Sequence, residues 1–321
     1  MMYLKRLFIV FGIIFLVAYS TGLILDHRYK KRWSVLFFEK SDELIKGNKN
    51  YDVIFMGNSR VHFGINPYYV DSATKLNSYN FGNGGADAED IMLTANIYLQ
   101  KHPAPKLAVI SLDKGALLKN EILRSRFYYL FYLENDTISK YMSQAGFLTS
   151  LIKIFPFTKY CFLDEYNRTS LFIRGKQYPG FDHNIHKGFI NIHQNINTKV
   201  AGLYNEKEDR SELSDSAITF FRNTVSMLQQ KGSMVVFVSP PEKRSSATID
   251  ASVRMLADSV FNSIEKEFKI PHLHFEKNDL FTDAYFVDDI HLNEPGTRIY
   301  SLQLADSIKS IYAGIKKNKT N

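Results

Sequence analysis

The sequence is poor in cysteine and tryptophan, with one of each among 321 residues. The single cysteine, Cys161, allows no internal disulfide and offers no thiolate set for a structural zinc site, so we expect a buried, inert thiol. Basic residues exceed acidic ones by only 40 to 33. The sequence has no basic stripe interleaved with aromatic residues, which argues against a nucleic-acid groove. These absences exclude a disulfide framework, a zinc-stabilised fold and a nucleic-acid-binding protein.

One uncharged stretch, residues 7–25, is long enough to cross a bilayer core as a helix. Basic residues precede it and follow it, the latter at 28–32, so its direction is not determined by charge. A signal peptide cut after Ser20 is the competing interpretation, but the apolar run continues through Leu25, which favours an uncleaved anchor. We therefore predict a single-pass membrane anchor at residues 1–33.

Beyond the anchor, short β-branched runs alternate with amphipathic helical patterns. The expected strands are residues 53–56, 78–81, 107–112, 234–238 and 272–275. The expected helices are residues 90–101, 211–230, 253–268 and 294–315. Alternation of this kind is typical of a parallel sheet with helices on both faces. We therefore predict an α/β fold, a flavodoxin-like three-layer sandwich around a central parallel sheet of about five strands.

The domain boundaries follow from composition. A polar linker at 34–50 separates the anchor from a domain at 51–315, and residues 316–321 form a tail. Residues 115–210 break the alternation and are rich in aromatics. A structureless loop of that length is implausible in a compact domain, so we predict a helical insertion. It acts either as a lid or substrate-binding subdomain, or as a scaffold that packs on the sheet.

The residues best suited to chemistry follow expected strands, where open α/β sheets bind their ligands. Ser59 comes directly after the first strand, at a turn that exposes its hydroxyl and leaves its backbone N–H free. Asp288 and His291 lie three residues apart before the last helix, so the carboxylate can orient the imidazole toward a nucleophile. Taken singly, such a serine is often a helix cap and such a pair is often a surface turn.

Together these segments resemble the SGNH (GDSL-like) hydrolase superfamily, whose serine follows the first strand and whose Asp-x-x-His precedes the last helix. Gly-Asn-Ser-Arg at 57–60, followed by Val-His-Phe-Gly-Ile-Asn-Pro at 61–67, resembles the membrane-anchored envelope members of the alginate-acetylation and DltD-like kind. The resemblance implies that Ser59, Asp288 and His291 are the catalytic residues.

The sequence departs from this family at two positions. Asn58 stands where the family usually has Asp, and Asp113 stands where its oxyanion-hole Asn is expected. The hole glycine falls at Gly82 or Gly85, with Gly85 slightly preferred, and the N–H of Ser59 is the second donor. An ionised Asp repels an oxyanion, and losing one hole donor typically costs ~3 kcal/mol.

Three further residues are candidates for substrate binding: Arg60, His62 and Asp113. For Arg60 the alternative is a salt bridge to Asp87 or Glu89. For His62 the alternative is a histidine packed in the core or at the surface.

Neither a metal nor a cofactor is expected. His183, His186 and His193 cluster in the insertion, but no nearby acidic or thiol set completes a metal site. Serine-dependent acyl transfer needs no cofactor.

The resemblance implies an acyl-transfer enzyme, an O-acetyltransferase or an esterase, whose substrate is a cell-envelope polysaccharide or another acylated sugar polymer. It also implies a membrane-bound O-acyltransferase as partner and an extracytoplasmic domain on the periplasmic side. The alternative is a catalytically inactive SGNH-fold envelope protein that binds a glycan or a partner acyltransferase. Asn58 and Asp113 favour this alternative, whereas the intact serine, histidine and aspartate set favours the enzyme.

Overall fold

The computed structural model describes residues 2–33, 38–118, 124–144, 146–162, 186–192, 212–243, 251–276 and 278–319. The chain divides into two compact units. The first consists of Met1–Phe38 and Ile122–Tyr178, and the second consists of Glu39–Glu121 and Pro179–Asn321.

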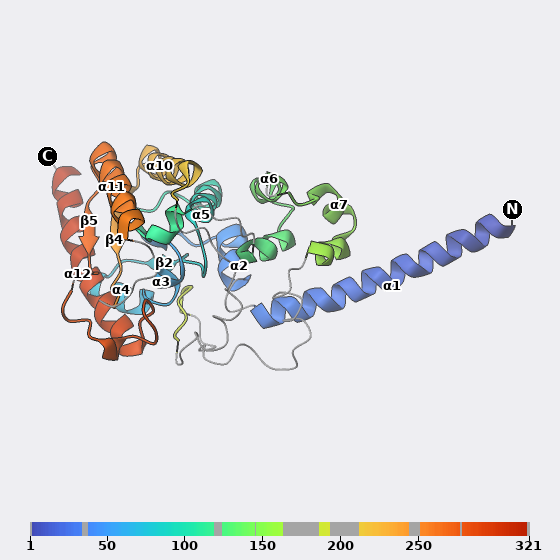
Figure 1. The fold of residues 1–321 in the computed structure, drawn as a ribbon, viewed down its shortest axis with the longest axis horizontal. Helices are drawn as coiled ribbons and strands as arrows, with labels where there is room; N and C mark the ends of the chain where they lie inside the picture. Colours follow the sequence, from blue (N-terminus) through green and yellow to red (C-terminus); the bar gives the residue numbers. More distant parts are fainter. Residues whose placement is uncertain are drawn as a thin grey trace. The chain divides into compact units, whose positions relative to one another are not determined.

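A five-stranded parallel sheet lies at the centre of the second unit (Figure 1). Its strands are β1 (Val53–Met56), β2 (Ser78–Asn80), β3 (Leu107–Ser111), β4 (Met234–Ser239) and β5 (His272–His274). The order β2-β1-β3-β4-β5 is the flavodoxin-like order, so the predicted fold class is confirmed. Every residue of β1 and β3 is buried, which explains why these strands are continuous apolar runs in the sequence.

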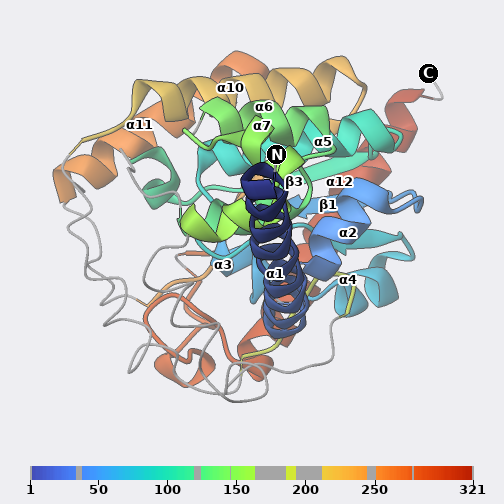
Figure 2. The same ribbon diagram turned by 90° about the vertical axis from the view of Figure 1, so that its right-hand side faces the viewer.

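Helices cover both faces of the sheet (Figure 2). On one face α4 (Pro67–Thr74) packs beside α12 (Glu294–Lys319). On the other face lie α5 (Ala88–Lys101), α10 (Asp215–Gln230) and α11 (Ala251–Phe268). Successive side chains of a strand point to opposite faces of the sheet. Accordingly, the alternate residues Val53 and Phe55 share one core cluster with Tyr300 of α12.

The polar linker predicted before the first strand contains a helix. Residues Glu39–Lys46 form α2, which packs against α5 and buries Lys40, Leu44 and Ile45. Charged side chains outnumber apolar ones in this short segment, so its buried stripe is hard to see in the sequence.

Helical structure also makes up most of the described part of the predicted insertion, except residues 186–192, which form a turn closed by a bridge between His186 and Phe189. Its elements are the 3-10 segments η2 (Lys114–Leu117), η3 (Arg124–Phe131) and η4 (Pro156–Phe162) and the helices α6 (Asp136–Gln144) and α7 (Thr149–Ile154). Cys161 is exposed on η4, so the expectation of a buried thiol was wrong. A lone cysteine carries no periodic pattern that would reveal which side of its element faces solvent.

The first unit contains α1 (Met2–Trp33), one continuous helix. The most apolar 18-residue window within Tyr3–Lys31 has a mean hydropathy of 2.5, and only 6% of this window is buried. By length and composition α1 is able to cross a bilayer, as a membrane anchor or a signal sequence does.

Gly57 generates a stability prediction for the turn between β1 and the segment that carries Ser59. A Cβ at Gly57 would lie 2.6 Å from Cγ2 of Val61 and 2.8 Å from Cβ of Ser111. We expect Gly57→Ala to lower the free energy of unfolding by about 1–3 kcal/mol, measured by urea denaturation. The matched control is Gly84→Ala, because a Cβ at Gly84 meets nothing within 4 Å. Equal effects of the two substitutions would contradict the prediction.

Candidate active site

Ser59 is the first residue of the short helix α3 (Ser59–His62), directly after β1 and its turn. Asn58 caps this helix, and its side-chain oxygen accepts from the backbone N–H of Arg60 at 3.0 Å. Asn and Asp are about equally good N-caps, so Asn58 performs this local function as well as the Asp expected there. The N–H of Ser59 lies at the first helical position, where an amide has no partner within the helix.

A chain of hydrogen bonds joins Ser59, His291 and Asp288. With the imidazole proton on Nδ1, His291 donates to Oδ2 of Asp288 at 2.7 Å. The Ser59 hydroxyl then donates to Nε2 of His291 at 2.8 Å. The two partners are 232 residues apart in the sequence, yet the sheet brings them to the same edge.

Asp288 is buried and fixed by its own turn. Its Oδ1 accepts from the backbone N–H groups of Ile290, at 3.0 Å, and His291, at 2.8 Å. Burial acts to raise its pKa, but the hydrogen bond and charge of His291 and the two amides together hold the pKa of Asp288 below its usual value. Asp288 is therefore ionised at neutral pH and able to stabilise a protonated His291.

An aromatic stack supports the imidazole from the α3 side. The ring of Phe63 meets the ring of His291 edge-on, with 5.7 Å between centroids. The ring of His62 stacks on Phe63 at 4.5 Å. His62 is completely buried, so it has no surface to offer a substrate and does not fit the substrate-binding role considered for it. Its function in this structure is packing.

Burial also lowers the pKa of His62 and the pKa of Lys40. Both of its ring nitrogens are buried without a hydrogen-bond partner among the described residues. Burial, with the nearby charges of Lys40 and His291, holds the pKa of His62 well below its usual value. Burial likewise lowers the pKa of Lys40, whose Nζ donates to the carbonyl of Gly82. Lys40 thus anchors the glycine loop that follows β2.

The contacts of this loop distinguish between Gly82 and Gly85, the two candidate glycines of the oxyanion hole. The N–H of Gly82 donates to the side chain of Asn80 at 2.9 Å, so Gly82 is not available to an oxyanion. The loop is also tied to the turn before Ser59, because Asn83 donates to the carbonyl of Gly57 at 2.9 Å. Gly85 is exposed and has a φ of 73°, a conformation that favours glycine. Of the two glycines, Gly85 is the one that remains a candidate donor.

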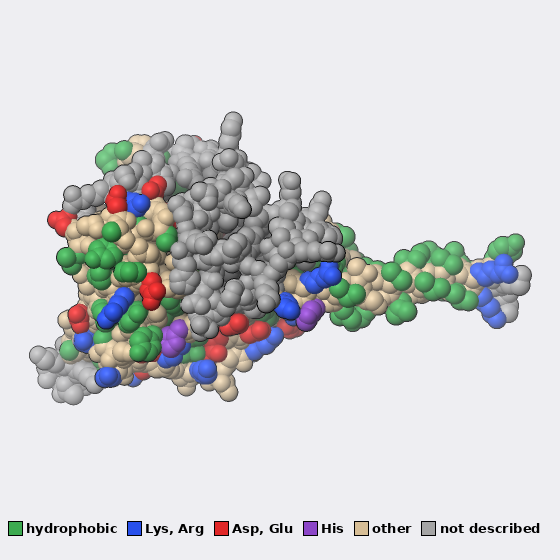
Figure 3. Space-filling view, turned by 90° about the horizontal axis from the view of Figure 1, so that it is seen from below, with side chains coloured by type: hydrophobic (Ala, Val, Ile, Leu, Met, Phe, Trp, Pro, Cys, Tyr) green, Lys and Arg blue, Asp and Glu red, His purple; other side chains and the backbone are tan. Residues whose placement is uncertain are grey.

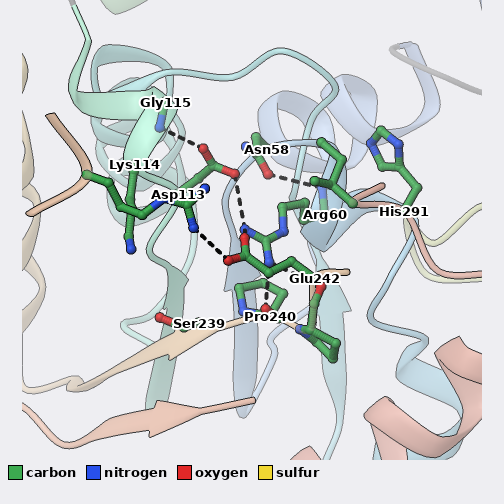
Figure 4. A network of polar contacts seen from close by, with 12 residues as sticks. Asn58, Arg60, Asp113, Lys114, Gly115, Ser239, Pro240, Glu242 and His291 are labelled. Atoms are coloured by element: carbon green, nitrogen blue, oxygen red, sulfur yellow. Dashed lines mark hydrogen bonds and ion pairs between the residues drawn. The ribbon is translucent and has the colours of Figure 1, made fainter. Parts of the chain in front are cut away.

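Arg60 has a buried side chain that connects three strand ends (Figure 4). Its Nη2 donates to the carbonyls of Pro240, at 2.6 Å, and Pro241, at 3.1 Å, directly after β4. Its Nη1 lies 3.6 Å from the carboxylate of Asp113, which follows β3. Arg60 therefore holds the turn beside Ser59 to the neighbouring strands, and its burial leaves little surface for a substrate.

A second carboxylate completes this network. Glu242 lies 3.6 Å from Nη1 of Arg60 and accepts from Arg254 of α11 at 3.1 Å. The structure thus corrects the expected partners of Arg60, which were Asp87 or Glu89. Those residues are closer to Arg60 in sequence, but the topology of the sheet places the ends of β3 and β4 around the guanidinium.

Asp113 has both carboxylate oxygens engaged. Oδ1 accepts from the N–H of Gly115 at 2.8 Å and caps η2, while Oδ2 faces Arg60. The negative charge that would repel an oxyanion is therefore paired with a guanidinium. A contact with substrate is not needed to explain why an aspartate stands here.

A cavity of about 160 Å³ opens where α4 and α12 begin. It is lined by Asn66, Tyr69, His186, Phe189, Asn191, Glu294 and Thr297. Thr297 links it to the candidate site, because its hydroxyl donates to the carbonyl of Phe63 at 3.1 Å. Asn191 lines the cavity, and its Oδ1 is buried without a hydrogen-bond partner among the described residues. The other two histidines considered for a metal, His183 and His193, lie outside the described residues.

Sequence reasoning missed Lys40, Glu242 and Arg254. Lys40 lay in the segment interpreted as a linker, and the other two belong to a network that only the folded sheet assembles. The composition of these segments carries no motif that would have singled them out.

The fold and the hydrogen-bonded set define a class: an α/β sandwich protein with serine, histidine and aspartate aligned at the carboxyl edge of its sheet. Solved structures similar to this chain include an acetyl xylan esterase, with 13% identity and a TM-score of 0.41 over 81% of this chain and 98% of that chain. They also include a GDSL-like lipase from Bacteroides thetaiotaomicron, with 12% identity and a TM-score of 0.38 over 87% and 98%. A mutant of the esterase AlinE4 has 11% identity and a TM-score of 0.35 over 83% and 96%. No protein-family model and no curated protein matches the chain.

The Arg60 network generates a stability prediction. Removing one partner of a buried ion pair leaves uncompensated charge, so we expect Arg60→Met to lower the free energy of unfolding by about 3 kcal/mol. The control is Arg222→Met, whose ion pair with Glu267 is exposed on both sides, and which should cost less than about 1 kcal/mol. Urea unfolding of both variants measures the difference. Comparable losses would show that the Arg60 contacts contribute no more than a surface pair.

His62 generates a prediction about pH. Because its folded pKa is depressed, the unfolded chain binds more protons at acid pH, and the folded state loses stability as pH falls below the ordinary histidine pKa. His62→Phe keeps the stack and removes this titration. From about pH 7.5 to about pH 5.5 the wild type should lose about 1.4 kcal/mol relative to His62→Phe. If the difference in unfolding free energy between the wild type and His62→Phe stays constant over this pH range, the prediction is wrong.

Proposed function

We propose that the protein is a serine-dependent acyl-transfer enzyme, an O-acetyltransferase or esterase, acting on a polysaccharide or glycopolymer of the cell envelope. The observation that carries the proposal is the unbroken hydrogen-bond chain from Ser59 through His291 to the buried Asp288. The alignment supports nucleophilic catalysis, because a base lies within reach of the hydroxyl and a carboxylate orients the base.

In the proposed reaction, His291 takes the proton of Ser59 as Oγ attacks the carbonyl carbon of an acyl ester. The backbone N–H groups of Ser59 and Gly85 stabilise the resulting oxyanion. As the intermediate collapses, the acyl C–O bond breaks and His291 gives its proton to the departing alcohol. A sugar hydroxyl or water then attacks acyl-Ser59, with His291 again acting as base. The first acceptor makes a transferase and the second an esterase.

The cavity beside the site supports a hydroxyl-rich substrate. Tyr69 and Phe189 supply aromatic faces, and Asn191 and Glu294 supply hydrogen-bond acceptors. Such surroundings suit a sugar ring, whose C–H face packs on aromatic rings and whose hydroxyls donate hydrogen bonds.

The proposed location is the membrane, with α1 as a single-pass anchor and the globular part on the periplasmic side. The length and apolar surface of α1 support the anchor. A membrane-bound O-acyltransferase that carries acyl groups across the bilayer is the proposed partner.

Asp113 and the engaged N–H of Gly82 favour one alternative, a catalytically inactive envelope protein that binds a glycan or a partner acyltransferase. In that protein the Ser59 hydroxyl would be held by His291 but never acylated, because the oxyanion would lack sufficient donors.

Acylation of Ser59 tests the two functions against each other. We expect full-length protein in detergent to form acetyl-Ser59 from p-nitrophenyl acetate, detected by intact and peptide mass. Ser59→Ala should abolish this modification because it lacks the hydroxyl, and His291→Ala should slow it roughly ten-thousand-fold.

The chain offers a matched control for this assay in a second serine–histidine pair. Ser239 Oγ lies 2.8 Å from Nε2 of His272, but burial lowers the pKa of His272 to about 4, which makes it a weak base. Ser239→Ala should therefore leave acylation unchanged. Absence of acetyl-Ser59 in the folded wild type would favour the inactive binding protein.

A further inference from the structure

A second apolar surface lies beside α1 within the first unit. Leu148, Leu151 and Ile154, on and next to α7, are 58%, 40% and 68% exposed. Their spacing of three residues places them along one side of the helix, whereas Ile152 is buried on another. Large apolar side chains that are exposed together, as these three are on and next to α7, mark a surface that suits an apolar neighbour.

Phe155 and Phe157, which follow α7 in the sequence, contact α1 and show which part of α1 this surface adjoins. The ring of Phe15 lies 5.8 Å from the ring of Phe155 and 6.0 Å from that of Phe157. Phe157 also approaches α1 at Gly22, where a Cβ would lie 2.6 Å from the Cβ of Phe157. The glycine thus permits η4 to pack directly against the backbone of α1, and α7 in turn packs on η4.

A polar cluster marks where α1 leaves its apolar stretch. Asp26 accepts from Lys159 Nζ at 2.9 Å and from the Tyr160 hydroxyl at 2.5 Å. At a helical rise of about 1.5 Å per residue, Gly22 is roughly 6 Å and Phe15 roughly 16 Å along the axis from Asp26.

The uncharged stretch of residues 7–25 therefore extends over roughly 28 Å, close to the thickness of a bilayer core of about 30 Å. Hydrophobic side chains cover this length of α1 (Figure 3). If residues 7–25 occupy the hydrocarbon, then Phe155 and Phe157 lie inside it as well, and Ile154 is adjacent to Phe155.

We propose that α7 and the start of η4 are a second membrane-contacting element, with Leu148, Leu151 and Ile154 inserted among the lipid acyl chains beside α1. The apolar surface of α7 is continuous with that of α1 through Phe155 and Phe157. Burial of the three side chains contributes in proportion to the apolar area removed from water. The element works as an interfacial amphipathic helix does, and it fixes how far the first unit sits in the bilayer.

The experiment measures lipid contact directly in the full-length protein, reconstituted at one copy per lipid nanodisc in phosphatidylcholine and phosphatidylglycerol. Cys161→Ser first removes the native exposed thiol. An environment-sensitive NBD label is then attached to Leu148→Cys or Ile154→Cys. The matched control is Leu280→Cys in the second unit, since Leu280 is 58% exposed, as Leu148 is. Quenching by lipids with a doxyl group on the acyl chain and by aqueous iodide is recorded for each label.

We expect labels at 148 and 154 to emit at shorter wavelength, to lose most of their fluorescence to the doxyl lipid and to resist iodide. The label at 280 should show the reverse. If iodide quenches the labels at 148 and 154 as strongly as the label at 280, the proposal is overturned. The surface would then be one that contacts a protein partner. Because all positions are exposed, the substitutions do not disturb the core, and an unchanged unfolding transition checks this.

Discussion

A buried guanidinium is the constraint around which the candidate site is organised. A charge removed from water must find partners, and Arg60 finds carbonyls after β4 and carboxylates after β3 and β4. Since Arg60 follows Ser59 directly, the same contacts fix the backbone of Ser59. The position of Ser59 therefore depends on the ends of two strands, of which β4 is followed by a residue 180 positions after Arg60 in the sequence.

The same constraint explains the most unusual residue near the site. An aspartate at position 113 opposes anion binding if it stands alone, but here Arg60 and the N–H of Gly115 engage its oxygens. Asn58 caps α3 as an aspartate would, but it adds no further negative charge beside Ser59. The two residues at which the sequence departs from the SGNH pattern it resembles thus both contact Arg60, Asn58 at its backbone N–H and Asp113 at its guanidinium.

The sheet could be predicted from sequence because its strands carry a local signal, whereas the serine, histidine and aspartate set was singled out by the resemblance of its order along the chain to the SGNH superfamily. Buried parallel strands are continuous apolar runs, and Ser59, Asp288 and His291 follow strands or precede a capped helix. The partners of Arg60 and the anchoring by Lys40 could not be predicted, because they join segments that only the folded topology brings together. Helix α2 was missed because charged residues dominate its sequence, and exposure of Cys161 has no sequence signal.

The order of the site residues along the chain has a consequence for biogenesis. Ser59 is made early, whereas Asp288 and His291 come close to the C-terminal helix α12. A polypeptide that is stalled or clipped before residue 288 would keep its apolar N-terminal helix and the Ser59 hydroxyl but would lack the imidazole and carboxylate that hold this hydroxyl in the full fold. The hydrogen-bonded set therefore exists only in a chain that has been made and folded beyond residue 291.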